Sequence, residues 1–197
     1  MTEVMKIDLS NALLTLLNTK RLDQITIKKL TEVGHCSRMS FYYHFRSMNE
    51  LVEYTFLRIG NQILAQENKE DSYSRKMKLL MMSAQKYKKV IDNVYYSTGR
   101  TQVENFLYRV VSDYIGDIID MQDLSKKLSP KQKKQIVDFY KYSCVGELLD
   151  WVEQGMPDEY QETIDWISSI IVNTLPGACE AVARKGEKNC GKAEKEL

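Results

Sequence analysis

The side chains of this chain that could do chemistry gather in one short segment, between Ile25 and Tyr54. The second half of the segment combines hydroxyl, aromatic and basic groups, which bond to phosphates and to the edges of bases. Both histidines of the chain, His35 and His44, also lie there. No GxSxG, HExxH or glycine-rich phosphate loop accompanies them, so the sequence does not indicate an enzyme. The pattern favours the binding of a polyanion.

Two short helices joined by a tight turn must hold these side chains. Thr26 and Ser37 are suitable N-caps for the two helices. Phe41 and Phe45 lie one helical turn apart, so we expect them to anchor the second helix in the core. The second helix then turns outwards a set of polar and long side chains, namely Arg38, Met39, Ser40 and Tyr42. This is the layout of a helix-turn-helix, whose second helix enters the major groove of DNA.

The charge of the chain is uneven, although its formal sum is only +1. Between Asn18 and Arg46, the basic residues Lys20, Arg21, Lys28, Lys29, Arg38 and Arg46 face only the acids Asp23 and Glu32. This local excess of positive charge falls on the segment that would meet phosphates. A solvated helical face is the alternative explanation, and charge alone does not exclude it.

Composition restricts the class of protein further. The chain has 197 residues, of which 43% are hydrophobic, and no apolar run approaches the roughly 20 residues that cross a bilayer. Its N-terminus lacks the pattern of an export signal. The four cysteines (Cys36, Cys144, Cys179 and Cys190) are scattered, so we expect reduced thiols and neither disulfides nor a zinc site. The sequence indicates a cytoplasmic protein that needs no cofactor and does not associate with a membrane.

Apolar residues recur at three- and four-residue spacing throughout, which predicts an all-α fold. Ile7, Leu14 and Leu17 are expected on the inward face of the first helix, with Leu13 and Leu16 close by. Pro176-Gly177 is expected to kink or end the last helix. The charged residues after Arg184 favour a disordered tail. The expected helices cover residues 5–19, 26–33, 37–43, 48–66, 73–91, 101–120, 131–154 and 159–184. A break is expected at residues 68–72, and Ser129 is expected to cap the helix whose first turn contains Pro130. The expected domains are a DNA-binding head (1–48), a regulatory and dimerisation domain (49–184) and the tail (185–197).

The motifs ITIKKL and SRMSFYYHF, followed by the SxNEL helix start at Ser47, resemble the N-terminal signature of the TetR family of bacterial transcription regulators. The resemblance implies a three-helix helix-turn-helix head on a larger helical domain that binds a ligand and dimerises. It also implies that Tyr43, His44, Thr26 and Lys28 bind backbone phosphates. The full set of expected DNA-binding residues is Thr26, Lys28, Arg38, Met39, Ser40, Tyr42, Tyr43, His44 and Arg46.

Two positions depart from the family pattern. The family usually has glycine where His35 stands, because the turn there needs a positive φ. Here glycine comes one residue earlier, so either the turn is shifted or His35 adopts the left-handed region, which histidine tolerates better than most residues. Many members also have a phosphate-binding lysine where this chain has Met48, and Arg46 is the candidate to replace that contact.

The body of the chain offers two further predictions. Residues 144–170 resemble the penultimate and last helices of some TetR-like proteins, which form a four-helix bundle with a second subunit. The expected interface residues are Val145, Leu149, Ile164, Ile167 and Ile171, unless these stripes face the core of their own subunit. Methionine and tyrosine suit an adaptable effector pocket, although structural core is the commoner role. The expected pocket residues are Met81, Met82, Tyr87, Tyr95, Phe106 and Tyr140.

The resulting hypothesis is a homodimeric, sequence-specific transcription regulator. It would bind a palindromic double-stranded DNA operator and act as a repressor that a small-molecule effector releases. The alternative is a TetR-like adaptor or co-activator that binds other proteins and binds DNA weakly or not at all. The sequence does not separate repression from activation, because both need the same head.

Overall fold

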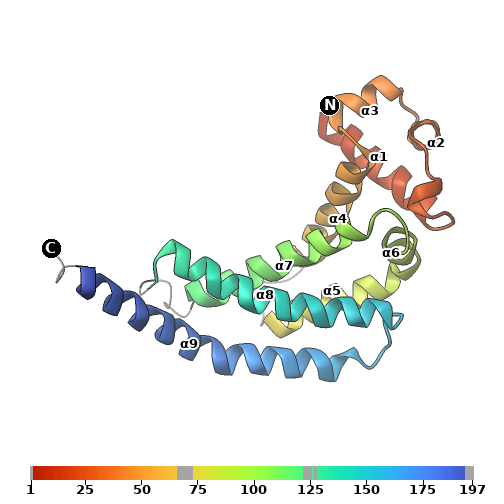
Figure 1. The fold of residues 1–197 in the computed structure, drawn as a ribbon. Helices are drawn as coiled ribbons and strands as arrows, with labels where there is room; N and C mark the ends of the chain where they lie inside the picture. Colours follow the sequence, from red (N-terminus) through yellow and green to blue (C-terminus); the bar gives the residue numbers. More distant parts are fainter. Residues whose placement is uncertain (1, 66–72, 122–125, 127, 194–197) are drawn as a thin grey trace. The chain divides into compact units, whose positions relative to one another are not determined.

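The computed structural model describes residues 2–65, 73–121, 126 and 128–193, and every element in these ranges is helical, which confirms the predicted all-α fold (Figure 1). The chain forms two compact units, residues 1–106 and 107–197, whose boundary lies within α7. The predicted boundary at residue 48 separates a functional head inside the first unit and stays a prediction. The helices are α1 (Thr2–Leu17), η1 (Leu22–Gln24), α2 (Ile27–Val33), α3 (Arg38–His44), α4 (Met48–Leu64), α5 (Tyr73–Lys86), α6 (Lys88–Tyr95), α7 (Arg100–Met121), α8 (Pro130–Glu153) and α9 (Tyr160–Ala193).

In the first unit, α1 to α3 and the start of α4 enclose one apolar core. Its members are almost fully buried: Leu9, Leu13, Leu17, Leu30, Phe41, Phe45, Leu51 and Val52. Leu13, Leu16 and Leu17 of α1 are buried as predicted. Ile7 and Leu14 are only half-buried while Leu9 is fully buried, so the inward face is rotated somewhat from the predicted one. The leucine-rich run fits a helical stripe in more than one rotation, and contact with α2, α3 and α4 selects this one.

The predicted helix 73–91 is two helices in the structure, α5 and α6, which meet at Tyr87. The backbone of Tyr87 leaves the helical region, with φ −96° and ψ 16°. Helix α6 then continues to Tyr95, and a turn leads into α7. A break between α5 and α6 lets α6 pack against α1 as well as α5. The predicted break at residues 68–72 lies outside the described residues.

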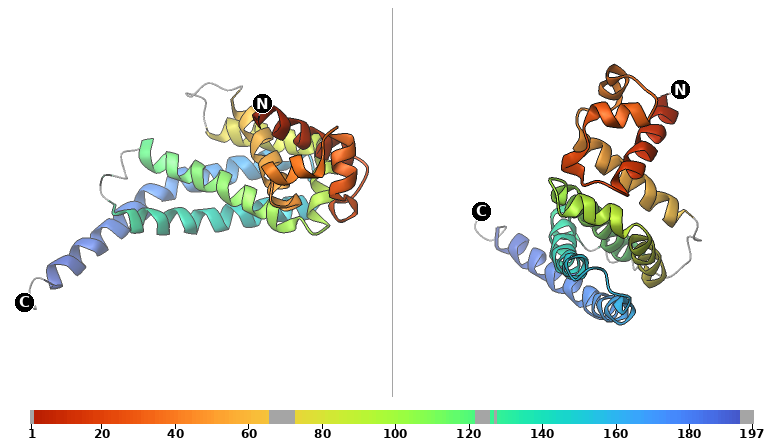
Figure 2. Two further views of the ribbon diagram at one scale, coloured as in Figure 1. Left: turned by 90° about the horizontal axis from the view of Figure 1, so that it is seen from above. Right: turned by 90° about the vertical axis from the view of Figure 1, so that its right-hand side faces the viewer.

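The second unit is built on an antiparallel hairpin of α8 and α9 (Figures 1 and 2). Ser129 and Gln132 form a capping box at the start of α8, and Pro130 occupies its first turn, as the predicted Ser129 cap requires. The turn between the helices places Gly155 and Met156 at positive φ (83° and 54°). The Trp151 indole N–H donates to the Pro157 carbonyl at 3.1 Å, which closes the turn.

Helix α9 runs through Pro176 without ending. The neighbouring residues Leu175 and Cys179 are buried. Their packing stabilises the helix at Pro176, which has no backbone N–H to donate. Figure 1 shows that α9 bends along its length. It is helical as far as Ala193, so residues 185–193, which were predicted to belong to a disordered tail, continue the last helix. No helix in the described part of the chain has both the length and the apolar character to cross a membrane.

Candidate nucleic-acid interface

In the turn between α2 and α3, Gly34 and His35 have different structural roles. His35 takes the left-handed conformation, with φ 50°, which confirms one of the two alternatives left by the sequence. Gly34 has a negative φ and serves close packing instead, because a Cβ there would lie 3.3 Å from the Leu30 carbonyl oxygen and 3.4 Å from Leu9 Cδ2. The Cys36 amide donates to the Thr31 carbonyl at 3.0 Å and closes the turn.

Side-chain caps fix where both helices of the motif begin. The Thr26 hydroxyl accepts from the Lys29 amide at 3.2 Å, and the Ser37 hydroxyl accepts from the Ser40 amide at 3.0 Å. Both predicted caps are thus confirmed. Each satisfies an amide that a helix start would otherwise leave unpaired. In α2 the buried residues are Leu30 and Thr31. Thr31 can be buried because its hydroxyl donates to the carbonyls of Ile27 and Lys28 and needs no water.

Two phenylalanines anchor α3 to the head. Phe41 and Phe45 are buried as predicted, with ring centroids 6.0 Å apart, and Phe45 also meets Tyr54 of α4 at 5.4 Å. The opposite face of α3 is open: Met39 is 83% exposed and Tyr43 77% exposed. Arg38 and Tyr42 are also exposed, whereas Ser40 and His44 are half-buried. A rigidly held helix therefore presents long polar and apolar side chains to solvent.

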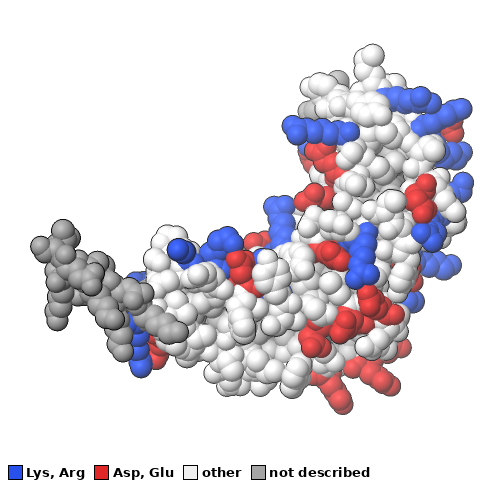
Figure 3. Space-filling view, viewed as in Figure 1, with Lys and Arg blue, Asp and Glu red and all other residues white. Residues whose placement is uncertain are grey.

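The basic residues around this helix are exposed (Figure 3). Arg21 is engaged by Asp23 at 3.1 Å and Lys29 by Glu32 at 3.4 Å. Within the described residues, the ammonium of Lys28 and the guanidinium of Arg38 have no carboxylate partner. Charges that are not neutralised by the protein remain available to phosphates or base edges.

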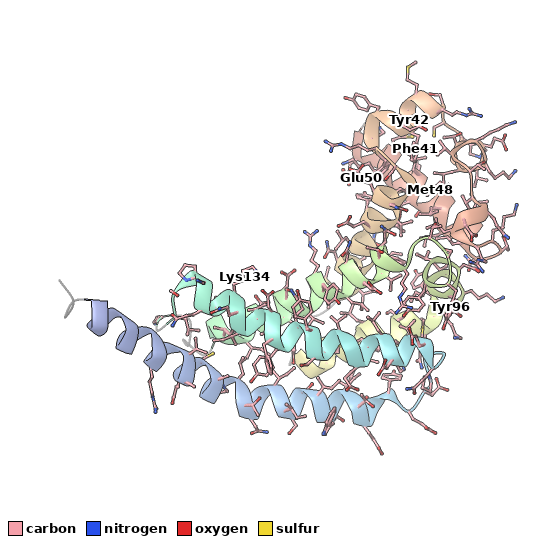
Figure 4. All side chains as sticks on the ribbon, viewed as in Figure 1. Phe41, Tyr42, Met48, Glu50, Tyr96 and Lys134 are labelled. Carbon is pink, nitrogen blue, oxygen red and sulfur yellow. The ribbon has the colours of Figure 1, made fainter. Side chains whose placement is uncertain are left out.

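The start of α4 differs from a full capping box. The Ser47 hydroxyl accepts from the Glu50 amide at 3.3 Å, but the Glu50 carboxylate accepts from the Arg46 amide at 2.6 Å rather than from Ser47 (Figure 4). Glu50 therefore places a negative charge at a helix N-terminus beside Arg46. Met48 next to it is half-buried and carries no charge.

Polar and close contacts tie the head to the rest of its unit. Asn93 of α6 donates to the carbonyl of Leu17, the last residue of α1, at 2.7 Å. Arg58 of α4 donates to the Ser10 hydroxyl at 3.1 Å and to the Asn11 side-chain oxygen at 2.8 Å. Gly99 packs so closely that a Cβ would lie 2.7 Å from Leu22 Cδ2 of η1. Through Asn93 and Gly99, α6 and the turn that follows it contact the head directly.

Comparison with known protein families shows to which family of helical proteins this chain belongs. The model of a transcriptional regulator C-terminal region of the TetR type (TetR_C_8) matches residues 71–173, just over half of the chain. The chain belongs to the TetR family of transcription regulators. Among solved structures, the dihydroxyacetone kinase operon activator DhaS has the same fold, with a TM-score of 0.64 and 14% sequence identity over 87% of this chain and 96% of that one. No curated protein matches the chain in sequence.

In this TetR-family chain the predicted pocket residues do not share one environment. Met81 and Tyr95 are buried, whereas Met82 and Tyr87 are exposed. The Tyr95 ring is covered by the Arg100 guanidinium, 4.7 Å from the ring centroid. The remaining two have aromatic or hydroxyl partners: Phe106 packs on Phe56 at 5.8 Å, and the Tyr140 hydroxyl bonds with that of Thr174 at 2.9 Å. Their role in ligand binding stays a prediction.

Sequence reasoning missed two polar groups in the first unit. The Asp92 Oδ1 and Gln102 Oε1 atoms are buried and have no hydrogen-bond partner in the described structure. The other Asp92 oxygen is held by Lys88 at 3.2 Å. A buried acceptor without a donor is unfavourable, so a donor supplied by a bound molecule or water would stabilise it. The sequence carries no signal for this, because burial of single atoms depends on the packing of α6 and α7.

The predicted interface residues divide by burial. Val145, Ile164 and Ile171 are buried within their own unit, and Leu149 and Ile167 are half-buried. The three buried residues lie in the core of their own subunit, which is the alternative that the sequence left open. The large apolar side chains that α8 and α9 expose are different ones: Phe139, Tyr142, Trp166, Ile170 and Val172. Groups of three or more His, Cys, Asp or Glu residues that could hold a metal ion do not occur among the described residues.

Proposed function

We propose that this chain is a sequence-specific DNA-binding transcription regulator that works as a homodimer and is released from its operator by a small molecule. The observation that carries the proposal is the exposed face of α3, held by two buried phenylalanines and flanked by cations without carboxylate partners. A helix-turn-helix with such a face fits the major groove. Membership of a family of transcription regulators supports the same function.

The roles of the side chains follow from their chemistry. Arg38 is proposed to read a guanine through its O6 and N7 atoms, and the exposed Met39 to contact a thymine methyl group. Ser40 and Tyr42 face the same groove. Tyr43, His44, Thr26, Lys28 and Arg46 are proposed to bind backbone phosphates, which fix the orientation of the head but carry no sequence information.

Control by an effector is proposed to act through α6. Asn93 and Gly99 hold α1 and η1, so a shift of α6 would move the head or loosen it. An effector that donates a hydrogen bond to the orphaned acceptors of Asp92 or Gln102 would bind next to this contact. The effector must bind the released state more tightly than the DNA-bound state, since equal affinity shifts nothing.

A two-fold dimer is proposed because two heads match the two halves of a palindromic operator. The exposed apolar side chains of α8 and α9 are the candidates for its interface. Phe139 is 69% exposed and Trp166 is 56% exposed, which is unusual for such large side chains on a single subunit.

Repression is the simpler of the two directions of regulation. A repressor needs only to occupy a promoter, whereas an activator needs a further contact with the transcription machinery. The similar structure DhaS is named an operon activator, but at 14% identity that name describes DhaS alone. Measuring transcription from the bound promoter with and without the protein would determine whether it represses or activates.

Selection from a random double-stranded DNA library tests the proposal. Purified protein is expected to enrich a palindrome with half-sites one or more helical turns apart, and Arg38→Ala is expected to lose the preference at one base pair of each half-site. The adaptor alternative is favoured by one observation, the uncharged Met48 beside the Glu50 carboxylate at the start of α4. If the selection enriches no sequence, and the protein binds the candidate operator no better than random DNA, the adaptor alternative would be favoured.

A further inference from the structure

We propose that a second basic surface, formed where the end of α1 meets the junction of α5 and α6, binds the phosphates of double-stranded DNA. The inference rests on the proposed function, which supplies the DNA, and adds a contact that lies outside the helix-turn-helix. This surface, the α6 patch, comprises the charged residues Lys20, Arg21, Asp23, Lys86, Lys88, Lys89 and Asp92.

Contacts within the first unit bring the parts of the α6 patch together. The Asn93 amide of α6 donates to the carbonyl of Leu17, the last residue of α1, at 2.7 Å, and Lys20 follows three residues later. Lys89 precedes Asn93 by one helical turn, so the two side chains share a face of α6. Lys86 ends α5 three residues before Lys89. Cations from two segments far apart in the sequence therefore gather around the end of α1.

The carboxylates of the α6 patch neutralise only part of its positive charge. Arg21 pairs with Asp23 at 3.1 Å, and Lys88 pairs with Asp92 at 3.2 Å. Five cations and two carboxylates leave the patch with a formal charge of +3. The α6 patch is thus basic after both ion pairs are counted.

The remaining charge belongs to three lysines. Lys20, Lys86 and Lys89 are exposed and have no carboxylate partner within the described residues. Close by, Arg100 and Glu104 pair at 2.9 Å and add no net charge. The C-terminus of α1 carries roughly half a negative charge from the helix dipole, which offsets some of the repulsion among the lysines. This offset is too small to neutralise them, so the patch still attracts an anion.

The α6 patch continues the proposed DNA-binding surface of α2. Lys20 and Arg21 lead through η1 directly to Thr26 and Lys28, which are proposed phosphate contacts. The turn after α6 packs on η1 as well, since a Cβ on Gly99 would lie 2.7 Å from the η1 leucine. In Figure 3, lysine and arginine atoms follow the right-hand edge of the first unit from the level of α3 to the level of α6. A DNA backbone bound at α2 can therefore extend onto the patch.

The chemistry of the α6 patch favours phosphates over a protein partner. Lysine is depleted in protein–protein interfaces, which favour arginine and aromatic side chains around an apolar centre. Tyr87, which lies beside the unpaired lysines and is 39% exposed, ends in a hydroxyl that can also donate to a phosphate. Phosphate contacts carry no sequence information. The patch should therefore add affinity and salt dependence without changing the operator sequence.

Lysine footprinting of the wild-type protein tests the α6 patch directly. The protein is acetylated briefly with and without its selected palindrome, on a fragment that extends one helical turn beyond each half-site, and its peptides are analysed by mass spectrometry. Lys20, Lys86 and Lys89 should lose most of their reactivity when DNA is bound. Lys131 of α8, which is exposed, should react at the same rate in both samples. Patch lysines that keep their full reactivity in the complex would overturn the inference.

A salt titration of the triple variant Lys20→Gln/Lys86→Gln/Lys89→Gln measures the same contact. The plot of log K against log[salt] should become shallower by about 0.9 for each removed phosphate contact in each subunit. Selection from random DNA should enrich the same palindrome as for the wild type, because the recognition helix is unchanged.

A matched control, Lys131→Gln/Lys133→Gln/Lys134→Gln, removes three charges from the second unit and should leave the slope unchanged. A patch variant that keeps both the wild-type slope and the palindrome would overturn the α6 patch while operator binding stands. Wild-type protein that selects no DNA sequence would instead overturn the proposed function, and the α6 patch with it. Footprinting needs no variant, so it decides the question even if the triple variant does not fold.

Discussion

At the scale of single residues, the most informative position is His35. A non-glycine residue with a φ of 50° is strained, because its Cβ crowds the neighbouring carbonyl. The imidazole is exposed, and no hydrogen bond or ion pair to another described residue compensates for the strain. The residue is therefore tolerated in the turn rather than required by it, whereas Gly34 is required for space against α1.

We expect His35→Gly to stabilise the protein by about 1 kcal/mol, which raises the melting temperature by a few degrees. Thermal unfolding followed by circular dichroism measures the change. His35→Ala is the control, because it removes the imidazole but keeps the strained φ. An equal gain in both variants would show that the ring, and not the backbone, is unfavourable.

Burial protects the thiol of Cys144. Desolvation, with a smaller contribution from Glu147, raises the pKa of Cys144 from 9.0 to about 11. At pH 9 its thiolate fraction is then roughly fiftyfold lower than in the unfolded chain, so native Cys144 should resist iodoacetamide and react after unfolding in urea. Because the folded pKa is raised, this group's contribution to stability is complete below pH 9.0 and is lost as the pH rises to about 11. Peptide mass spectrometry checks the protection, and rapid labelling of the native protein would contradict it.

Met48 offers a gain-of-function test. By resemblance to the TetR family, a lysine at this helix start would bind a phosphate. Met48→Lys should therefore steepen the plot of log K against log[salt] by about 0.9 for each head and tighten binding at low salt. Fluorescence anisotropy with operator DNA gives both quantities. Met48→Gln, a neutral polar control, should change neither, and a lysine variant that behaves like the glutamine one would remove this residue from the interface.

At the scale of secondary-structure elements, α6 is one of the links between the head and the rest of its unit. The Asn93 amide satisfies the carbonyl at the end of α1, where helical hydrogen bonds run out. We expect Asn93→Ala to cost about 1 kcal/mol of stability and to speed amide exchange in residues 16–25. Hydrogen exchange with mass spectrometry measures this region. Asn61→Ala, a change at an exposed asparagine of α4, is the control and should leave the exchange unchanged.

The elements also show which structural features the sequence patterns predict and which they do not. Thr26, Ser37 and Ser129 were predicted as caps correctly, because capping depends on a few neighbouring residues. The aromatic anchors of α3 were predicted for the same reason. The rotation of α1 and the break at Tyr87 were not, since both depend on which helices pack alongside.

The same limit applies to the candidate sites. The exposed face of α3 follows from a single amphipathic helix, so the sequence located it well. The burial of Val145, Ile164 and Ile171 depends on packing between α8 and α9, which apolar spacing alone does not specify. The buried acceptors of Asp92 and Gln102 depend on single atoms and left no sequence signal.

At the scale of the whole molecule, the proposal requires two heads acting together. Each head is proposed to offer two cationic phosphate contacts, Lys28 and Arg46, in addition to hydroxyl and imidazole groups. A dimer doubles the contacts, so its affinity for DNA should depend on salt much more steeply than that of one head. Binding of an effector should weaken operator binding without dissociating the dimer, because the proposed effector contacts lie in the first unit and the proposed dimer contacts in the second.

The central claim is that the head binds specific DNA, and a salt titration with the DNA upstream of the chain's own gene tests it most directly. Two cationic contacts in each of two heads predict a slope of log K against log[salt] of about −3.6 or steeper. Arg38→Ala should lose about 1–3 kcal/mol of discrimination against a scrambled sequence, and Tyr43→Phe should weaken binding to both sequences alike. Binding with a shallow slope, equal for specific and scrambled DNA and unchanged by either substitution, would contradict the account.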